Sequence, residues 1–382
     1  MKKQVYLDHA ATTSLSKEAF EDMKPYLMDK FGNASSLHAL GIEAKKALMK
    51  SREQVAGVLG CRDKEIVFTA SGTEANNLAI KGVAENNNYK GHIITSTIEH
   101  HAVLETIQYL ETQGVAVTYL PVDRSGLVST SDLVRSLRHD TFLVSIMYAN
   151  NEIGTVQPIS EIGGLIKKRQ PNTLFHVDAV QAPGLLELNV EKLRCDLLSI
   201  SGHKFYGPKG TGVLYVRRGT KLAPQIFGGG QEQGLRSGTE NIPGIVGLAT
   251  ALVNAEKARV KEVIRLTKLR NWLISSISEK IPQAILTGHP GERLANNISF
   301  CFPGLEGEAL VMRLSERGFA CSAGSACATG SFASSHVLLA LGLSRDAALG
   351  SLRVSLGQGT RLSDLEAFLP ALAEEVEKLQ SF

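Results

Sequence analysis

The alternation of short apolar runs with helical segments between Glu65 and Val216 constrains the fold of this chain most. The segments between the runs, such as residues 102–113 and 159–169, are amphipathic and long enough for right-handed crossovers. This pattern predicts an α/β fold with a mainly parallel sheet covered by helices. The apolar runs occupy residues 66–68, 92–95, 115–120, 142–147, 174–177 and 197–200.

A different pattern follows a long helical stretch over residues 245–281, where short strands at 297–302 and 351–356 flank helices. At about 150 residues per domain, a chain of 382 residues favours two or three domains. We therefore expect a second, smaller domain to begin near residue 260.

The composition excludes several classes of protein. With 41 basic and 38 acidic residues the net charge is +3, and the basic residues are scattered, so no nucleic-acid footprint is visible. No apolar run approaches the roughly 18 to 20 residues of a membrane span. The 5 cysteines contain no Cys-x-x-Cys pair, which argues against a disulfide framework and a zinc knuckle. We expect a cytoplasmic protein that binds neither membrane, nucleic acid nor metal.

The first candidate for chemistry is Ser71-Gly72-Thr73, which follows a predicted strand and opens a helix. Unpaired N–H groups and the dipole at a helix start favour an anion, and the Thr73 hydroxyl adds a donor. Taken alone, such a segment is more often an ordinary helix cap.

The second candidate is Asp178, which ends the apolar run Phe175-His-Val. Ligand crevices of α/β sheets lie at the carboxyl ends of the strands. A carboxylate is costly there without a cationic partner. The alternative is an aspartate that caps a helix or forms a hydrogen bond in the core.

The third candidate is Lys204, which passes directly from a buried strand into a glycine-rich turn. A desolvated lysine amine is a nucleophile toward carbonyls, although many lysines merely extend to solvent. Three groups then have a common chemical logic. Lys204 supplies an amine for a Schiff base, Asp178 a partner for a pyridinium nitrogen, and the helix start at Gly72 and Thr73 a phosphate site. Those are the three anchors of pyridoxal 5'-phosphate.

At these positions the chain resembles the class V, fold-type I pyridoxal-phosphate enzymes, and among them the NifS/IscS-type cysteine desulfurases. The resemblance spans nearly the whole length. It implies a large domain over residues 14–260 with a mainly parallel seven-stranded sheet, and a smaller α+β domain formed by residues 1–13 and 261–382. The motifs that carry it are Tyr6–Thr13, Phe31–Asn33, Ser71–Glu74, Glu99–His100, Asn150–Thr155, Asp178–Gln181, Ser201–Lys204, Arg236–Thr239, Ser322–Cys327 and Arg353–Gly357.

The resemblance also implies roles for individual residues. Lys204 would bind the cofactor as a Schiff base, and Asp178 would pair with the pyridine nitrogen. Gln181 would bind the ring oxygen, and His100 would stack on the ring and move a proton. Thr239 would reach the phosphate of the neighbouring subunit. The remaining cofactor positions of the family fall at Gly72, Thr73, Asn151, Ser201 and His203.

The family's positions for the substrate carboxylate fall at Asn151 and Arg353, a role that a guanidinium fork suits. Without the family, Arg353 would be interpreted as part of a surface ion pair. Cys327 stands in a run of small and polar residues that suits an accessible loop. The family's nucleophilic thiol falls at this position. Cys321 occupies a position where the family often has an apolar residue, and we interpret it as structural.

The implied activity is removal of sulfur from L-cysteine by a homodimer whose active sites are shared across the interface. Its products would be L-alanine and a Cys327 persulfide, which acceptor proteins would draw on for iron–sulfur cluster assembly or tRNA thiolation. Alternatives on the same fold are a selenocysteine lyase, a cysteine-sulfinate desulfinase and a non-catalytic protein that binds partners. A metallohydrolase using His100, His101 and Asp178 is a more distant alternative, because adjacent histidines rarely share one metal.

Overall fold

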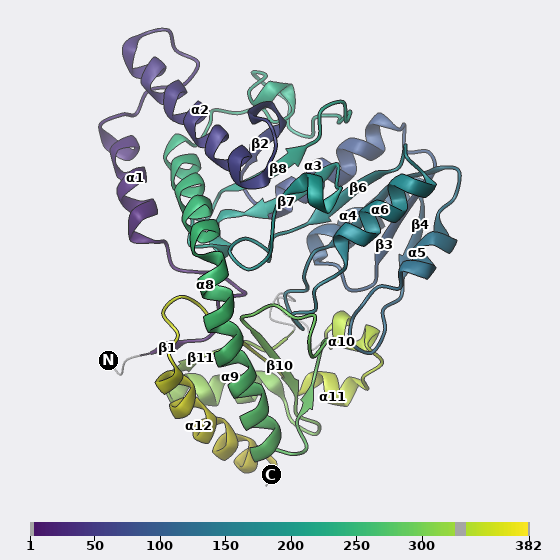
Figure 1. The fold of residues 1–382 in the computed structure, drawn as a ribbon, viewed down its shortest axis with the longest axis vertical. Helices are drawn as coiled ribbons and strands as arrows, with labels where there is room; N and C mark the ends of the chain where they lie inside the picture. Colours follow the sequence, from purple (N-terminus) through teal and green to yellow (C-terminus); the bar gives the residue numbers. More distant parts are fainter. Residues whose placement is uncertain (1–3, 325–333, 381–382) are drawn as a thin grey trace.

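The computed structural model of the protein describes residues 4–324 and 334–380. Its largest feature is a seven-stranded sheet (Figure 1). Only β8 runs against its neighbours, and the other pairings in this sheet are parallel. The predicted α/β fold is therefore confirmed. The strand order is β2 (Ile66–Thr69), β8 (Gly212–Val216), β7 (Leu197–Ser201), β6 (Leu174–Asp178), β5 (Thr141–Met147), β3 (His92–Ser96) and β4 (Ala116–Leu120).

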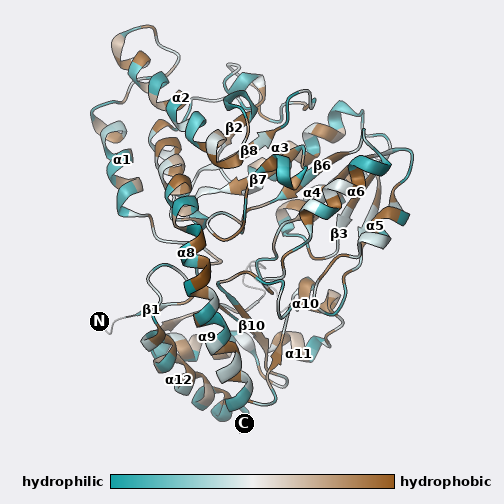
Figure 2. Ribbon diagram, in the orientation of Figure 1, coloured by the Kyte–Doolittle hydropathy of each residue, from teal (hydrophilic) through white to brown (hydrophobic). Residues whose placement is uncertain are grey.

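Both faces of this sheet are buried, which explains why its strands read as apolar runs. In β3, for example, Ile93 packs in a core with α3 and α4, whereas Ile94 packs in a core with α2, α6 and α8. Figure 2 shows the apolar residues concentrated in the sheet and on helix sides that face it. The helices of this part are α1 (Lys17–Met28), α2 (Ala39–Leu59), α3 (Gly72–Asn86), α4 (His101–Thr112), α5 (Thr130–Ser136), α6 (Ile159–Arg169) and α7 (Val190–Leu193).

A second part of the molecule is built on a three-stranded antiparallel sheet in the order β12 (Ser351–Ser355), β10 (Asn297–Cys301) and β9 (Ile285–Leu286). The first residues of the chain join it, because β1 (Val5–Tyr6) pairs with β11 (Phe319–Ala320) and Leu7 is buried in its core. Its helices are α9 (Gly307–Glu316), α10 (His336–Ala340), α11 (Arg345–Leu349) and α12 (Leu362–Gln380).

One long helix, α8 (Ile242–Lys280), connects the two parts (Figure 1). Its Leu248 and Leu252 pack in the core of the large sheet, and its Leu273 and Ile277 pack in the core of the small one. The predicted boundary at residue 260 falls inside this continuous helix, and the domain limits stay a prediction. Within the described ranges, none of the helices is both long and apolar enough to cross a bilayer.

Candidate active site

Four candidate residues lie where strands of the large sheet end. Asp178 is the last residue of β6 and Ser201 the last of β7. His100 follows β3 and immediately precedes α4, and Gly72 is the first residue of α3, just after β2. Since the carboxyl ends of parallel strands meet at one edge, the fold brings these groups to one site.

The carboxylate of Asp178 is held on both of its oxygens. It is 5% exposed, its Oδ2 accepts a hydrogen bond of 2.7 Å from Asn76 Nδ2, and its Oδ1 accepts one of 3.0 Å from the Val180 amide. The buried Oδ1 of Asn76 has no hydrogen-bond partner within the described residues. Sequence reasoning missed Asn76, whose only signal is an amide side chain at an otherwise apolar helical position.

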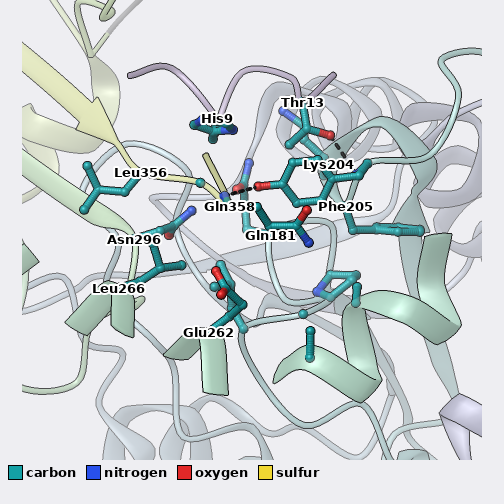
Figure 3. Close-up of a pocket in the computed structure, with 17 residues that line it drawn as sticks. His9, Thr13, Gln181, Lys204, Phe205, Glu262, Leu266, Asn296, Leu356 and Gln358 are labelled. Atoms are coloured by element: carbon teal, nitrogen blue, oxygen red, sulfur yellow. Dashed lines mark hydrogen bonds between the residues drawn. The ribbon is translucent and has the colours of Figure 1, made fainter. Parts of the chain in front are cut away.

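Lys204 ends a short 3₁₀ helix, η2 (Gly202–Lys204), directly after β7. Its Nζ donates to the carbonyl oxygens of Ala10 at 2.6 Å and Ala11 at 2.8 Å. Gln181 Nε2 donates to the same Ala10 oxygen at 3.0 Å. Figure 3 shows Lys204 and Gln181 on the wall of a pocket that His9 also lines. The N-terminal segment thus reaches the site through its backbone, a contact that no side-chain pattern could predict.

His203 faces the same N-terminal segment. Its Nδ1 lies 3.1 Å from Thr12 Oγ1, and its carbonyl oxygen accepts from the Thr13 amide at 2.8 Å. Burial, with the nearby charges of Lys204 and Lys209, lowers the pKa of His203 to about 4. The imidazole is therefore neutral near pH 7, and it can exchange hydrogen bonds without adding charge.

The His100 ring is oriented by the start of α4. Its Nδ1 accepts a hydrogen bond of 3.0 Å from the Ala102 amide, so a neutral ring carries its proton on Nε2. Burial lowers the pKa of His100; the charge of Asp178 opposes this shift, and those of Lys204 and His101 add to it. The three candidates His100, Asp178 and Lys204 therefore lie within electrostatic reach of one another.

The start of α3 lies closely against the ends of the strands. A Cβ at Gly72 would lie 2.7 Å from Val180 Cγ2 and 3.2 Å from Ser201 Cβ, so this approach requires glycine. The Ser71 hydroxyl caps the helix by accepting from the Glu74 amide, as the alternative interpretation of this segment predicts. Thr73 lines the same surface groove as His100. The helix start can accept an anion between these groups.

Arg353 belongs to the other sheet, within β12, and is 3% exposed. Its Nη2 lies 2.8 Å from Asp8 Oδ1, and its Nη1 donates to the Asn151 carbonyl oxygen at 3.0 Å. The buried Nε has no hydrogen-bond partner among the residues that the structure describes. Arg353 does form an ion pair, but its own side chain is 4% exposed, so the arginine is buried rather than at the surface, while its partner Asp8 is partly exposed at 19%.

The remaining candidates are Thr239 and Cys327. Thr239 is exposed, in the segment between η3 (Glu232–Gly234) and α8. Cys327 lies outside the described residues. Cys321 is 8% exposed, and burial raises its pKa to about 12, which suits the structural role predicted for it.

These groups fit pyridoxal phosphate chemically. A lysine amine can react with the aldehyde, and a buried carboxylate held in place by Asn76 can bind a protonated pyridine nitrogen. The start of α3, packed against Ser201, can bind the phosphate. Within the described residues no group of three or more His, Cys, Asp or Glu side chains is arranged to hold a metal ion.

Comparison with known proteins agrees with this chemistry. The sequence profile described as Aminotransferase class-V matches residues 5–368. The chain and its fold are thus those of a class V enzyme, a class that depends on pyridoxal phosphate. More narrowly, the chain belongs to the NifS/IscS-type cysteine desulfurase family, as the resemblance predicted.

The relatives cover the chain almost completely. It is 50% identical to "Cysteine desulfurase IscS" of Dictyoglomus turgidum, with 100% of this chain and 96% of the relative aligned. The protein of the same name from Methanosarcina thermophila is also 50% identical, over 99% of this chain and 93% of the relative. A solved "NifS-like protein" matches with a TM-score of 0.92 and 42% identity, covering 98% of this chain and 100% of the other. The structure described as "SspA in complex with cysteine" matches with a TM-score of 0.79 and 40% identity, over 92% and 98% of the two chains.

Proposed function

We propose that this protein is a pyridoxal-phosphate-dependent cysteine desulfurase. It removes sulfur from L-cysteine, releases L-alanine and keeps the sulfur as a persulfide on Cys327. The proposal is supported by the positions of three candidates after parallel strands of one sheet: Asp178 ends β6, Lys204 follows β7 and His100 follows β3. They supply a fixed carboxylate, an amine and an oriented imidazole. The family membership supports the same activity.

The cofactor would be held by Lys204, Asp178 and the start of α3, with Ser201 and His203 near its phosphate. When bound, it supplies an electron sink for the substrate Cα. Asp178 holds a proton at the pyridine nitrogen, and Asn76 keeps that carboxylate in position. The Lys204 amine removes the Cα proton, close to the carbonyl oxygens that fix its position.

The substrate carboxylate would lie on Arg353 and Asn151. The Cys327 thiolate then attacks the substrate sulfur, so an S–S bond forms as the C–S bond breaks. The electron pair of the broken bond stays with the substrate carbon, which takes up a proton and leaves as alanine. His100, with its mobile proton on Nε2, is the group that we assign to proton transfer at this stage.

We also propose a homodimer whose two active sites are shared. Apolar side chains that are more than half exposed lie at the end of α1 and in its connection to α2, including Met28 at 78%, Phe31 at 69% and Leu37 at 93%. Phe227 is also 78% exposed, in the loop that carries Thr239. Burial of these groups against a second copy would bring Thr239 to the neighbouring cofactor site. The sulfur acceptor and the cytoplasmic location stay predictions from the sequence.

The test is release of alanine and sulfide from L-cysteine and a reductant by the purified, cofactor-loaded protein. We expect equal amounts of both products, and loss of both in Cys327→Ala and Lys204→Ala. Cys61→Ala is the matched control, because Cys61 is half-buried and far along the chain from Cys327. Persistent cysteine turnover in Cys327→Ala would contradict the persulfide step.

The same assay distinguishes the alternative activities. A selenocysteine lyase or cysteine-sulfinate desulfinase depends less on a protein thiol, so Cys327→Ala should keep turnover of those amino acids while losing cysteine turnover. A wild-type protein that turns over selenocysteine or the sulfinate but not cysteine would favour that alternative. A protein that takes up no pyridoxal phosphate would favour the alternative of a non-catalytic protein that binds partners.

A further inference from the structure

The loop between β8 and α8 has an unusual backbone. Glu232 has a φ of +47° and Gln233 a φ of +61°, in the left-handed region that side chains other than glycine rarely occupy. Gly230, Gly234 and Gly238 in the same loop also have positive φ. Such a conformation at two consecutive non-glycine residues persists only where the surroundings hold it.

A buried ion pair holds this loop to the start of the large sheet. Arg52 on α2 donates to both carboxylate oxygens of Glu232, at 2.9 and 2.6 Å, and the two side chains are 9% and 3% exposed. The Phe68 amide in β2 donates to the same carboxylate at 2.9 Å, and Arg52 also donates to the Ile66 carbonyl oxygen at 2.6 Å. The Arg52 guanidinium lies 4.9 Å from the Phe68 ring centroid. Glu232 is thus fixed by directional bonds to β2.

A second ion pair holds the loop to the helix that follows β2. Arg236 Nε lies 2.8 Å from Glu74 Oε1, and Glu74 Oε2 accepts from the Ala70 amide at 3.0 Å. Glu74 directly follows Thr73 at the start of α3. The loop is therefore tied at Glu232 and at Arg236 to the β2–α3 connection, which we assign to the cofactor phosphate.

The same loop directs side chains away from its own subunit. Phe227 is 78% exposed, Ile226 is 40% exposed and Thr239 is also exposed. A buried Arg–Glu pair is directional, unlike an apolar contact, and breaking one partner leaves an uncompensated buried charge. The pair can therefore fix one conformation of a loop whose backbone would otherwise relax.

We propose that Arg52 and Glu232 are positioning residues that fix the loop over residues 226–240, so that Phe227 and Thr239 meet a second copy of the chain in one defined arrangement. The inference rests on the proposed homodimer and deepens it. Because the loop is tied to the β2–α3 connection of its own subunit, dimerisation and cofactor affinity become coupled. Loosening the loop therefore weakens both dimerisation and cofactor binding.

The test compares two variants with the wild-type protein. Glu232→Gln removes the charge but keeps an acceptor, and the double variant Arg52→Met/Glu232→Met replaces the pair with apolar side chains that leave no buried charge. Glu191→Gln is the matched control, since Glu191 also pairs with an arginine, Arg217, but is 65% exposed. We measure the dimer dissociation constant by sedimentation equilibrium and the pyridoxal-phosphate dissociation constant by absorbance titration.

We expect both constants to rise about tenfold or more in the double variant and to stay within about twofold in the control. If both constants stay at the wild-type values while Tm falls, the pair is a structural core element only and the proposal is overturned. Thermal melting is therefore recorded for every variant.

Hydrogen exchange of the loop amides provides a readout that does not depend on the proposed function. The Leu235 amide donates to the Glu232 carbonyl oxygen at 3.1 Å within this loop. We expect exchange across residues 230–238 to accelerate by about tenfold or more in the double variant. Unchanged exchange would overturn the proposal even if the wild-type protein proved to be a monomer or inactive on cysteine.

Discussion

The two sheets of this molecule position chemical groups in different ways. At the large sheet, the candidate residues stand at strand ends and helix starts, where Asp178 ends β6 and Lys204 follows β7. At the small sheet, Arg353 lies within β12 and is held by Asp8, which comes from the other end of the chain. The first arrangement depends on the topology of the sheet. The second depends on one ion pair between a buried arginine and a partly exposed aspartate.

This difference has a consequence for how each region tolerates substitution. Parallel strands bring their carboxyl ends to one edge whatever the neighbouring side chains are, so a single change there removes one function and leaves the geometry. The orientation of a buried arginine depends on its partners, and loss of a partner affects the arginine itself. The effects of substitutions at the two sheets should therefore differ in magnitude and in the property that they change.

The largest effect is expected at the large sheet. Lys204→Ala should reduce cysteine turnover by roughly 10³-fold or more, because it removes both the cofactor attachment and the base. The alanine assay measures this loss, and circular dichroism should show an unchanged fold. If Lys204→Ala retained more than a tenth of wild-type turnover, the amine at this strand end would not be the catalytic group.

Arg353→Ala should have the next largest effect, and it should act mainly on KM. Loss of a charge-assisted contact to a carboxylate costs about 1.5–3 kcal/mol, which corresponds to roughly 10- to 150-fold. Arg353→Lys keeps the charge without the fork and should recover part of this loss. Steady-state kinetics with L-cysteine separate KM from kcat. An effect on kcat alone would place Arg353 outside substrate binding.

Asp8→Asn should have a smaller effect of the same kind, about three- to tenfold on KM, because the introduced amide keeps an oxygen near the Arg353 guanidinium but loses the charge. Cofactor binding should not change, since the Lys204 contacts in this segment are made by backbone carbonyl oxygens. The pyridoxal-phosphate titration is the control. An equal loss of cofactor affinity would show that Asp8 orders the whole segment rather than Arg353.

The same difference explains what could be predicted from the sequence. The strands of the large sheet other than β8, and the positions of Asp178 and Lys204 at strand ends, were predictable because an apolar run followed by a polar side chain is a local signal. β8 was not among the predicted apolar runs. The burial of Arg353 was not, because it depends on a contact with Asp8 from the far end of the chain. Asn76 and the carbonyl oxygens around Lys204 were also missed, since a single amide in a helix and a backbone group carry no pattern. The enzyme family was predicted from the resemblance to known proteins, and the roles of the site residues stay predictions.

The last expected effect is on stability rather than on activity, and it concerns Glu99, a fully buried carboxyl group beside His100. Its Oε1 accepts from Ser96 Oγ at 2.5 Å and from the Met147 amide at 3.0 Å. Burial raises the pKa of Glu99 from 4.5 to about 8, against the effect of those hydrogen bonds. The edge of the large sheet thus favours the neutral form of Glu99 near Asp178, whereas the small sheet buries the Arg353 guanidinium beside the partly exposed side chain of Asp8.

This contrast can be measured through the pH dependence of stability. Between pH 4.5 and about 8 the folded protein binds the Glu99 proton and the unfolded chain does not, so this group's contribution to stability falls as pH rises through that window. Buried His176, whose pKa burial lowers to about 3, acts in the opposite direction, because its contribution is lost as pH falls below 6.5. Comparing Glu99→Gln with wild type cancels the histidine effect. We expect the difference in unfolding free energy between pH 5 and 8 to change by about 1–2 kcal/mol, measured by urea denaturation, with the variant less sensitive to rising pH. Parallel curves for the two proteins would mean that Glu99 is ionised in the fold, and that the large sheet buries a charge here as the small sheet does.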